Sequence, residues 1–95
     1  MIETLRFRLQ RGADEEEFLL ADKRLQSAFA YQQPGLLRRT TARGEESDWL
    51  VITLWDSPAS ADAGDPLRSD YTACREFVTF IDLTTMRSDR FQELE

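Results

Sequence analysis

The sequence predicts an α+β domain in which the elements follow the order β-α-β-β-α-β and the four strands form one antiparallel sheet. Three observations predict it. Residues 2–10, IETLRFRLQ, alternate polar and apolar side chains, as a strand with one buried face does. Residues 15–33 and 58–81 repeat apolar residues three and four positions apart, which is typical of helices. Two strand-like stretches, 36–43 and 49–55, lie between them and are joined by the polar loop GEESD.

The first half of the chain carries clear boundary signals. After the turn RGAD, Asp14 precedes three glutamates, and Glu17 completes a capping box at the positive end of the helix dipole. The helix is expected to run to about Gln33, because Pro34 cannot continue it and Gly35 lets the chain turn. Its apolar stripe consists of Phe18, Ala21, Leu25, Ala28 and Phe29.

The second half begins its helix at Ser57-Pro58, an N-cap followed by proline at the first helical position. The helix is interrupted at GDP, and Asp65-Pro66 predicts a restart. The stripe after the restart consists of Leu67, Tyr71, Cys74, Val78 and Ile81. Residues 82–91, DLTTMRSDRF, form the fourth predicted strand. This order is the ferredoxin-like split β-α-β arrangement, with both helices on one face of the sheet.

The third predicted strand, WLVITLW, is apolar on both faces. Trp49, Val51, Thr53 and Trp55 share one face, and Leu50, Ile52 and Leu54 share the other. The helices can cover only one of them, and large exposed apolar patches mark interfaces. The sequence therefore predicts a homodimer in which two sheets pack face to face into one α+β barrel.

Composition narrows the function classes. The chain has 95 residues, which predicts a single domain over residues 1–95, and a net charge of −6, which disfavours nucleic acid as a partner. The single cysteine precludes an internal disulfide, and the lack of histidine argues against a zinc site. The N-terminal segment is too polar for a signal peptide and no apolar run approaches a membrane span. We expect a cytoplasmic protein that does not associate with a membrane.

The motif PGLLRRTT, followed by a strand that ends in WDS and then by a helix, resembles the antibiotic biosynthesis monooxygenase domain family of the dimeric α+β barrel superfamily. That resemblance implies a pocket between the sheet and its helices, with Trp55 at the position of a pocket tryptophan. The family includes cofactor-free monooxygenases acting on aromatic polyketides and haem-degrading enzymes. The haem-degrading members use a histidine and an asparagine, and this chain contains neither, so haem degradation is rejected.

Five residues are candidates for a ligand site. Trp55 could stack on a flat ligand, or simply pack in the core. Asp22 borders the apolar stripe of the first helix and could act as a general base, or be a solvated boundary residue. Gln26 lies one turn further and could share hydrogen bonds with Asp22, or simply be a surface residue. Arg39 could point inward and pair with Asp22 or a ligand anion, or be an exposed arginine on an edge strand. Tyr71, on the inner stripe of the second helix, could donate to a bound oxygen or pack as core.

The function that these expectations favour is a small dimeric barrel that binds a compact, largely apolar or aromatic molecule and oxidises or rearranges it without a cofactor or metal. Asp22 and Trp55 are the catalytic candidates. The alternatives are a non-catalytic binding or accessory protein of the same fold, and a structural domain whose interior is filled by its own six phenylalanines and two tryptophans.

Overall fold

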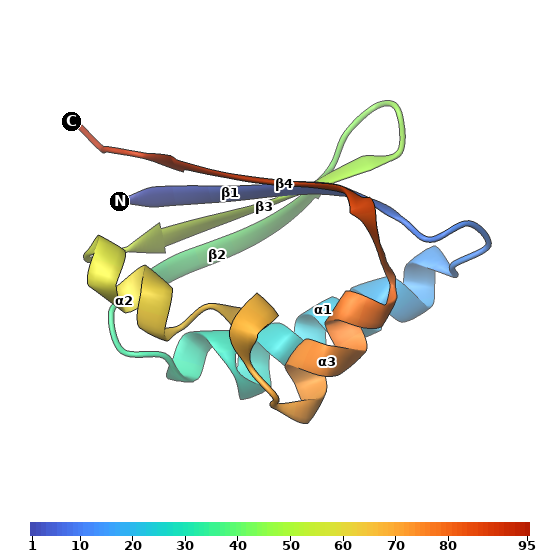
Figure 1. Ribbon diagram of the computed structural model, residues 1–95, viewed down its shortest axis with the longest axis horizontal. Helices are drawn as coiled ribbons and strands as arrows, with labels where there is room; N and C mark the ends of the chain where they lie inside the picture. The colour runs from blue at the N-terminus through green and yellow to red at the C-terminus, as the bar shows by residue number, and fades with distance from the viewer.

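The computed structural model describes residues 1–95, and the predicted fold class is confirmed. A four-stranded antiparallel sheet in the order β2-β3-β1-β4 carries the helices on one face (Figure 1). The strands are β1 (Ile2–Leu9), β2 (Leu36–Arg43), β3 (Asp48–Trp55) and β4 (Ile81–Phe91). The helices are α1 (Glu15–Ala28), η1 (Ala30–Gln32), α2 (Pro58–Ala63), η2 (Pro66–Arg68) and α3 (Thr72–Thr79), of which η1 and η2 are 3₁₀ turns.

Helix α1 begins as predicted and ends earlier than predicted. The Asp14 carboxylate accepts a hydrogen bond from the Glu17 backbone N–H at 3.1 Å, which satisfies one free donor of the first turn. The prediction that the helix continues to Gln33 is wrong, because α1 stops at Ala28 and a 3₁₀ turn follows. This tighter turn places both Phe29 and Ala30 in the core, where both are buried.

The second helical region is broken into three pieces instead of two. Asp65 caps the restart as predicted and accepts from the Leu67 N–H at 2.9 Å. The restart is only a 3₁₀ turn, however, and α3 begins at Thr72. Ile81, expected in the helical stripe, is instead the buried first residue of β4. No helix of the chain is both long enough and apolar enough to cross a membrane.

The two faces of β3 have different surroundings. Trp49, Val51 and Trp55 are buried against the helices, whereas Leu50, Ile52 and Leu54 are half-buried on the opposite face. Figure 1 shows α1, α2 and α3 all on one side of the sheet, so no element of this chain covers the other side.

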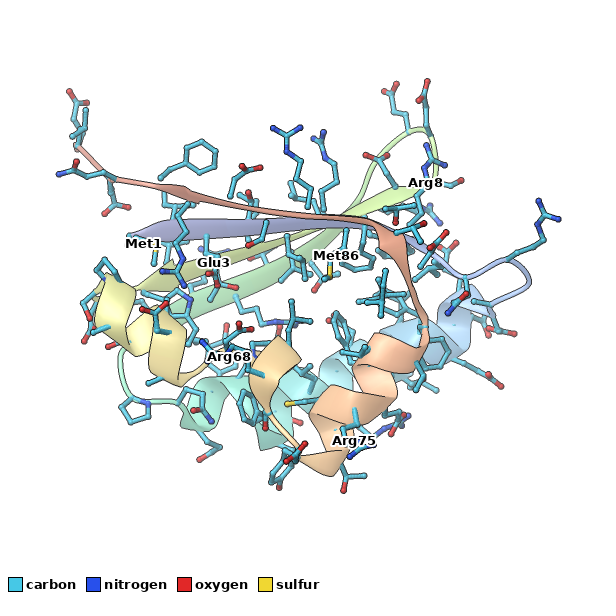
Figure 2. All side chains as sticks on the ribbon, in the orientation of Figure 1. Met1, Glu3, Arg8, Arg68, Arg75 and Met86 are labelled. Atoms are coloured by element: carbon cyan, nitrogen blue, oxygen red, sulfur yellow. The ribbon has the colours of Figure 1, made fainter.

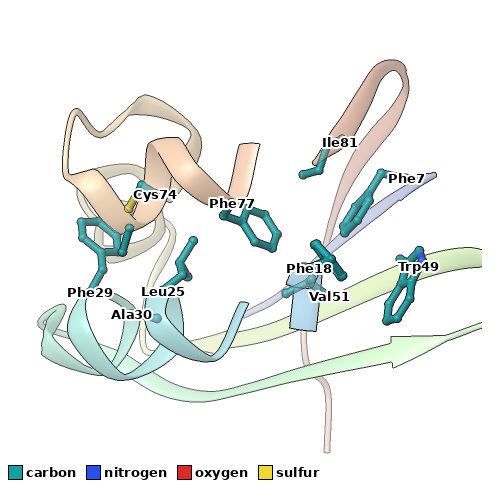
Figure 3. Close-up of a cluster of buried hydrophobic side chains, with 11 residues drawn as sticks. Phe7, Phe18, Leu25, Phe29, Ala30, Trp49, Val51, Cys74, Phe77 and Ile81 are labelled. Carbon is teal, nitrogen blue, oxygen red and sulfur yellow. The ribbon is translucent and has the colours of Figure 1, made fainter. Parts of the chain in front are cut away.

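Phe18 on α1 organises the core between the sheet and the helices (Figure 3). Its ring meets those of Phe7 at 5.8 Å, Trp49 at 4.9 Å and Phe77 at 5.5 Å between centroids. Edge-on and tilted contacts of this kind add to the stabilisation from burial. The core joins β1, β3, α1 and α3. It includes no residue of α2, so the space beside α2 is lined by other side chains.

Candidate functional site

One row of residues across the helix-facing side of the sheet is polar on all four strands, whereas the row beside it is apolar at its two central positions. The strand register places Arg39 of β2 opposite Thr53 of β3, Thr53 opposite Glu3 of β1, and Glu3 opposite Arg90 of β4. We call these four residues the polar row. The next row along the sheet contains Val51 and Leu5, which face each other. Figure 2 shows Glu3 on the side of the sheet that faces α2.

Arg39, at one end of the polar row, is held by α1. Its Nη2 donates to Asp22 Oδ1 at 2.7 Å, and the two side chains are only 4% and 10% exposed. Its Nη1 donates to Gln26 Oε1 at 3.2 Å and lies 3.4 Å from Thr41 Oγ1, and its guanidinium carbon lies 5.7 Å from the centre of the Phe77 ring. The predicted pairing of Arg39 with Asp22 is therefore present. The predicted bond between Gln26 and Asp22 is wrong, because Gln26 serves as an acceptor for Arg39.

A cavity of about 60 Å³ lies against the polar row and is partly open to solvent. Arg39, Thr53 and Glu3 contribute its polar wall, and Trp55 is among its apolar lining residues. Residues 64–67, which follow α2 and include the first two residues of η2, also line it, and we call them the roof. Neither Asp22 nor Gln26 lines the cavity, so both act on it only through Arg39.

Trp55 combines burial with an unused hydrogen-bond donor. The residue is 2% exposed, and its Nε1–H is the one fully buried side-chain polar group that has no partner in the chain. A buried donor without an acceptor costs free energy, so such a group calls for a partner. Gly64 of the roof approaches the indole closely: a Cβ added there would lie 2.6 Å from Trp55 Cη2.

Glu3 is the carboxylate of the polar row, and sequence reasoning missed it. Its side chain is 18% exposed, and its Oε2 accepts from Arg90 Nε at 3.0 Å. Arg90 Nη2 also donates to Asp62 Oδ1 of α2 at 2.7 Å, so Arg90 connects the sheet to α2. Hydrogen bonds to Asp62 and Glu3 both raise the pKa of Arg90. The parity of Glu3 with Leu5 and Phe7 was the available signal, since all three alternate onto the inner face.

The remaining candidates lie elsewhere. Tyr71, expected on the inner stripe of a helix, precedes α3, is 52% exposed and packs on Phe29, so its placement at the cavity is wrong. The reason is that α3 starts one residue later and leaves Tyr71 in the preceding loop. Cys74 is buried, and desolvation raises the pKa of its thiol although a hydrogen bond with Ser69 opposes the shift. It is therefore a core residue without nucleophilic character.

Comparisons with known proteins identify the fold. No protein-family model matches the sequence, and no curated protein sequence matches it significantly. The structure is similar to that of SnoaB, a cofactor-independent oxygenase from Streptomyces nogalater, with a TM-score of 0.77 and 18% identity over 99% of this chain and 92% of that one.

Two further solved structures agree with this result. One, from Nitrosomonas europaea and assigned to the antibiotic biosynthesis monooxygenases, has a TM-score of 0.76 and 12% identity over 99% of this chain and 98% of that one. Another, from Chloroflexus aurantiacus J-10-fl and assigned in the same way, has a TM-score of 0.67 and 18% identity over 100% of this chain and 97% of that one. This chain therefore has the fold of the antibiotic biosynthesis monooxygenase-like proteins.

Proposed function

We propose that the protein binds a compact, largely apolar or aromatic molecule in the cavity beside Trp55 and oxidises it without a cofactor. The observation that carries the proposal is the buried Trp55 Nε1–H, which has no partner within the chain and belongs to a residue that lines a cavity. An indole offers an aromatic face for a flat ligand and a single N–H for an oxygen acceptor. SnoaB, which shares the fold, supports the assignment of oxygenase chemistry.

The size of the cavity sets a condition on binding. Its volume of about 60 Å³ is well below the ~150 Å³ of an apolar cavity that takes up benzene. An aromatic ring therefore requires the roof to move outward. The roof belongs to the irregular segment between α2 and α3, which is the part of the cavity lining with the least regular hydrogen bonding.

The proposed reaction needs a substrate that supplies its own electrons. A hydroquinone meets this need: 1,4-dihydroxynaphthalene and O₂ give 2-hydroxy-1,4-naphthoquinone and water, so one oxygen atom enters the product and the other leaves as water. Oxygen uptake and mass analysis of the product formed under ¹⁸O₂ test the proposal. We expect label incorporation above the uncatalysed background, and its loss in Trp55→Ala. Incorporation that is equal with and without protein contradicts oxygenase activity on this probe.

A non-catalytic binding role is the second candidate, and one observation favours it. Asp22, the carboxylate expected to act as a base, is buried and paired with Arg39, away from the cavity lining. Binding of the naphthalene probe without protein-dependent oxygen uptake would support this role over the oxygenase.

The proposal includes a homodimer formed through the face of the sheet that the helices leave open. Ile2 pairs with Leu54 and Thr4 with Ile52 on this face, and Phe91 extends it on β4. Burying each large aliphatic side chain contributes about 1.5–3 kcal/mol. A second sheet packed on this face would thus stabilise a domain whose own core is small.

A further inference from the structure

We propose that Glu3 is the hydrogen-bond acceptor of the cavity, and that the cavity therefore selects uncharged ligands that carry a hydroxyl donor, such as phenols. This inference rests on the proposed ligand-binding function and identifies the ligand class for the same site. It also reassigns the chemistry of the site, since Asp22 was the carboxylate expected there.

The three carboxylates near the cavity differ in their position and in which of their oxygens already accept hydrogen bonds. Asp22 does not line the cavity and is occupied by Arg39. Asp65 also lines it: its Oδ1 caps η2 by accepting from the Leu67 N–H at 2.9 Å and its Oδ2 has no partner, but Asp65 belongs to the roof, which must move outward to admit an aromatic ring. Glu3 lines it and accepts from Arg90 through Oε2 alone, so Oε1 has no hydrogen-bond partner in the chain. Because Arg90 fixes one oxygen, the other is held in place to meet a ligand.

Complementary donors lie on the neighbouring strand. Thr53 is the cross-strand partner of Glu3, and Trp55 follows two residues later on the same face of β3. The Trp55 Nε1–H lacks an acceptor, whereas Glu3 Oε1 lacks a donor. A hydroxyl group both donates and accepts through one oxygen atom, so a ligand O–H that donates to Glu3 can also accept from a donor beside it, and Trp55 reports on that binding from the same lining.

The charges at the cavity disfavour anionic ligands. Two carboxylates, those of Glu3 and Asp65, line it against one guanidinium, that of Arg39, so a ligand carboxylate meets more negative than positive charge. Glu3 and Arg39 each have an ion-pair partner outside the lining, Arg90 and Asp22, which leaves this balance unchanged. Arg68 on η2 is exposed, forms no ion pair and is not a lining residue. Phenols therefore suit the site better than benzoates do.

Three probes of similar size test the inference: phenol, which donates a hydrogen bond; anisole, which only accepts one; and benzoate, which is an anion. The readout is the indole N–H signal of Trp55 in a ¹H–¹⁵N correlation spectrum. Only two such signals exist, because the chain has two tryptophans, and Trp49→Phe assigns them. We expect phenol to bind about tenfold more tightly than anisole, as loss of a charge-assisted hydrogen bond implies, and benzoate to bind most weakly.

The matched variants separate Glu3 from the rest of the site. In Glu3→Leu, phenol should lose its advantage while anisole binds as before. Glu3→Gln, which keeps the shape and a neutral acceptor, should reduce the advantage and serves if the leucine variant does not fold. The control is Glu15→Gln, which removes the charge of a carboxylate paired with Arg43 on the exposed surface, and it should change nothing.

The outcomes distinguish the two proposals. Equal binding of phenol and anisole by the unmodified protein, tightest binding of benzoate, or a phenol advantage that persists in both Glu3 variants would overturn the role of Glu3 and leave ligand binding intact. If none of the three probes shifts the Trp55 signal, the aromatic-binding function itself is wrong, and the inference about Glu3 is wrong with it.

Discussion

Arg39 Nη2 and Asp22 Oδ1 lie 2.7 Å apart across the gap between β2 and α1, and neither side chain is more than 10% exposed. A buried ion pair of this kind is costly to desolvate, and removing one partner is strongly destabilising because the other charge stays buried. The pair also fixes the guanidinium at the end of the polar row, where Arg39 lines the cavity. The ion pair thus holds Arg39 in place as part of the wall of the site, and other residues must carry out any chemistry.

Breaking this pair on one side should be strongly destabilising. We expect Arg39→Met to lower the free energy of unfolding by about 3–5 kcal/mol, because Asp22 would remain buried and uncompensated. Adding Asp22→Leu should recover part of the loss, and urea unfolding measures both. The exposed pair of Arg43 and Glu15 is the control, since Arg43→Met should cost less than about 1 kcal/mol. A double variant no more stable than Arg39→Met would contradict this account.

Gly64→Ala should disturb Trp55 by contact alone. The backbone at Gly64 has an ordinary φ of −103°, so any residue can adopt it. The new methyl group would nevertheless lie 2.6 Å from the indole, and the overpacking should cost about 1–3 kcal/mol and alter tryptophan fluorescence. Trp55→Phe in the same chain should relieve most of this cost. An additive cost in the double variant would show that the two residues are not in contact.

Placing a charge on the open face of the sheet tests the homodimer. Ile52→Arg puts a cation at the centre of this face, so light scattering coupled to size-exclusion chromatography should report the mass of one chain where the unmodified protein gives twice that mass. Leu20→Arg is the matched control, because Leu20 is 55% exposed on α1, away from the sheet. An unmodified protein that runs as a single chain at micromolar concentration would rule the dimer out.

The buried thiol of Cys74 should make stability fall at alkaline pH. Burial raises its pKa above the ordinary value of 9.0, so the unfolded chain loses the thiol proton at a lower pH than the folded chain. The contribution is constant below about pH 9 and decreases as the pH rises further toward the folded pKa. Urea midpoints at pH 8, 9 and 10 should therefore decline more steeply for the unmodified protein than for Cys74→Ala. Parallel declines would show that Cys74 does not cause them.

Much of the fold follows from local patterns. The alternation in residues 2–10, the capping box at Asp14 and the two-sided apolar strand at 49–55 each predict an element that the structure contains. The pairing of Arg39 with Asp22 was also predictable, because strand parity and helical periodicity aim the two side chains at one another. These are properties of neighbouring residues, so a single sequence contains them.

Strand parity places Glu3 on the inner face of β1, but it does not show which residues lie beside Glu3, and it does not predict the roof. Glu3 reaches the cavity because β1 lies between β3 and β4, which brings Thr53 and Arg90 to either side of it, and strand order is a property of the whole chain. Tyr71 was misplaced because Pro66 and the cap at Asp65 allow a helix restart that tertiary contacts reduce to a 3₁₀ turn. Irregular segments of this kind depend on packing more than on propensity.

The hydroxyl group of Tyr31 forms hydrogen bonds with the main chain of β2 at the edge of the sheet. It accepts from the Arg39 backbone N–H at 3.1 Å and donates to the Arg39 carbonyl at 3.3 Å, and β2 is the edge strand on that side. Both main-chain groups that an added strand would need at this point are therefore occupied by a side chain of the same molecule. Growth of the sheet into a fibre, or capture of a foreign peptide as a fifth strand, therefore cannot form its ladder through Arg39, whereas no side chain from another element bonds to the main chain of β4 at the opposite border.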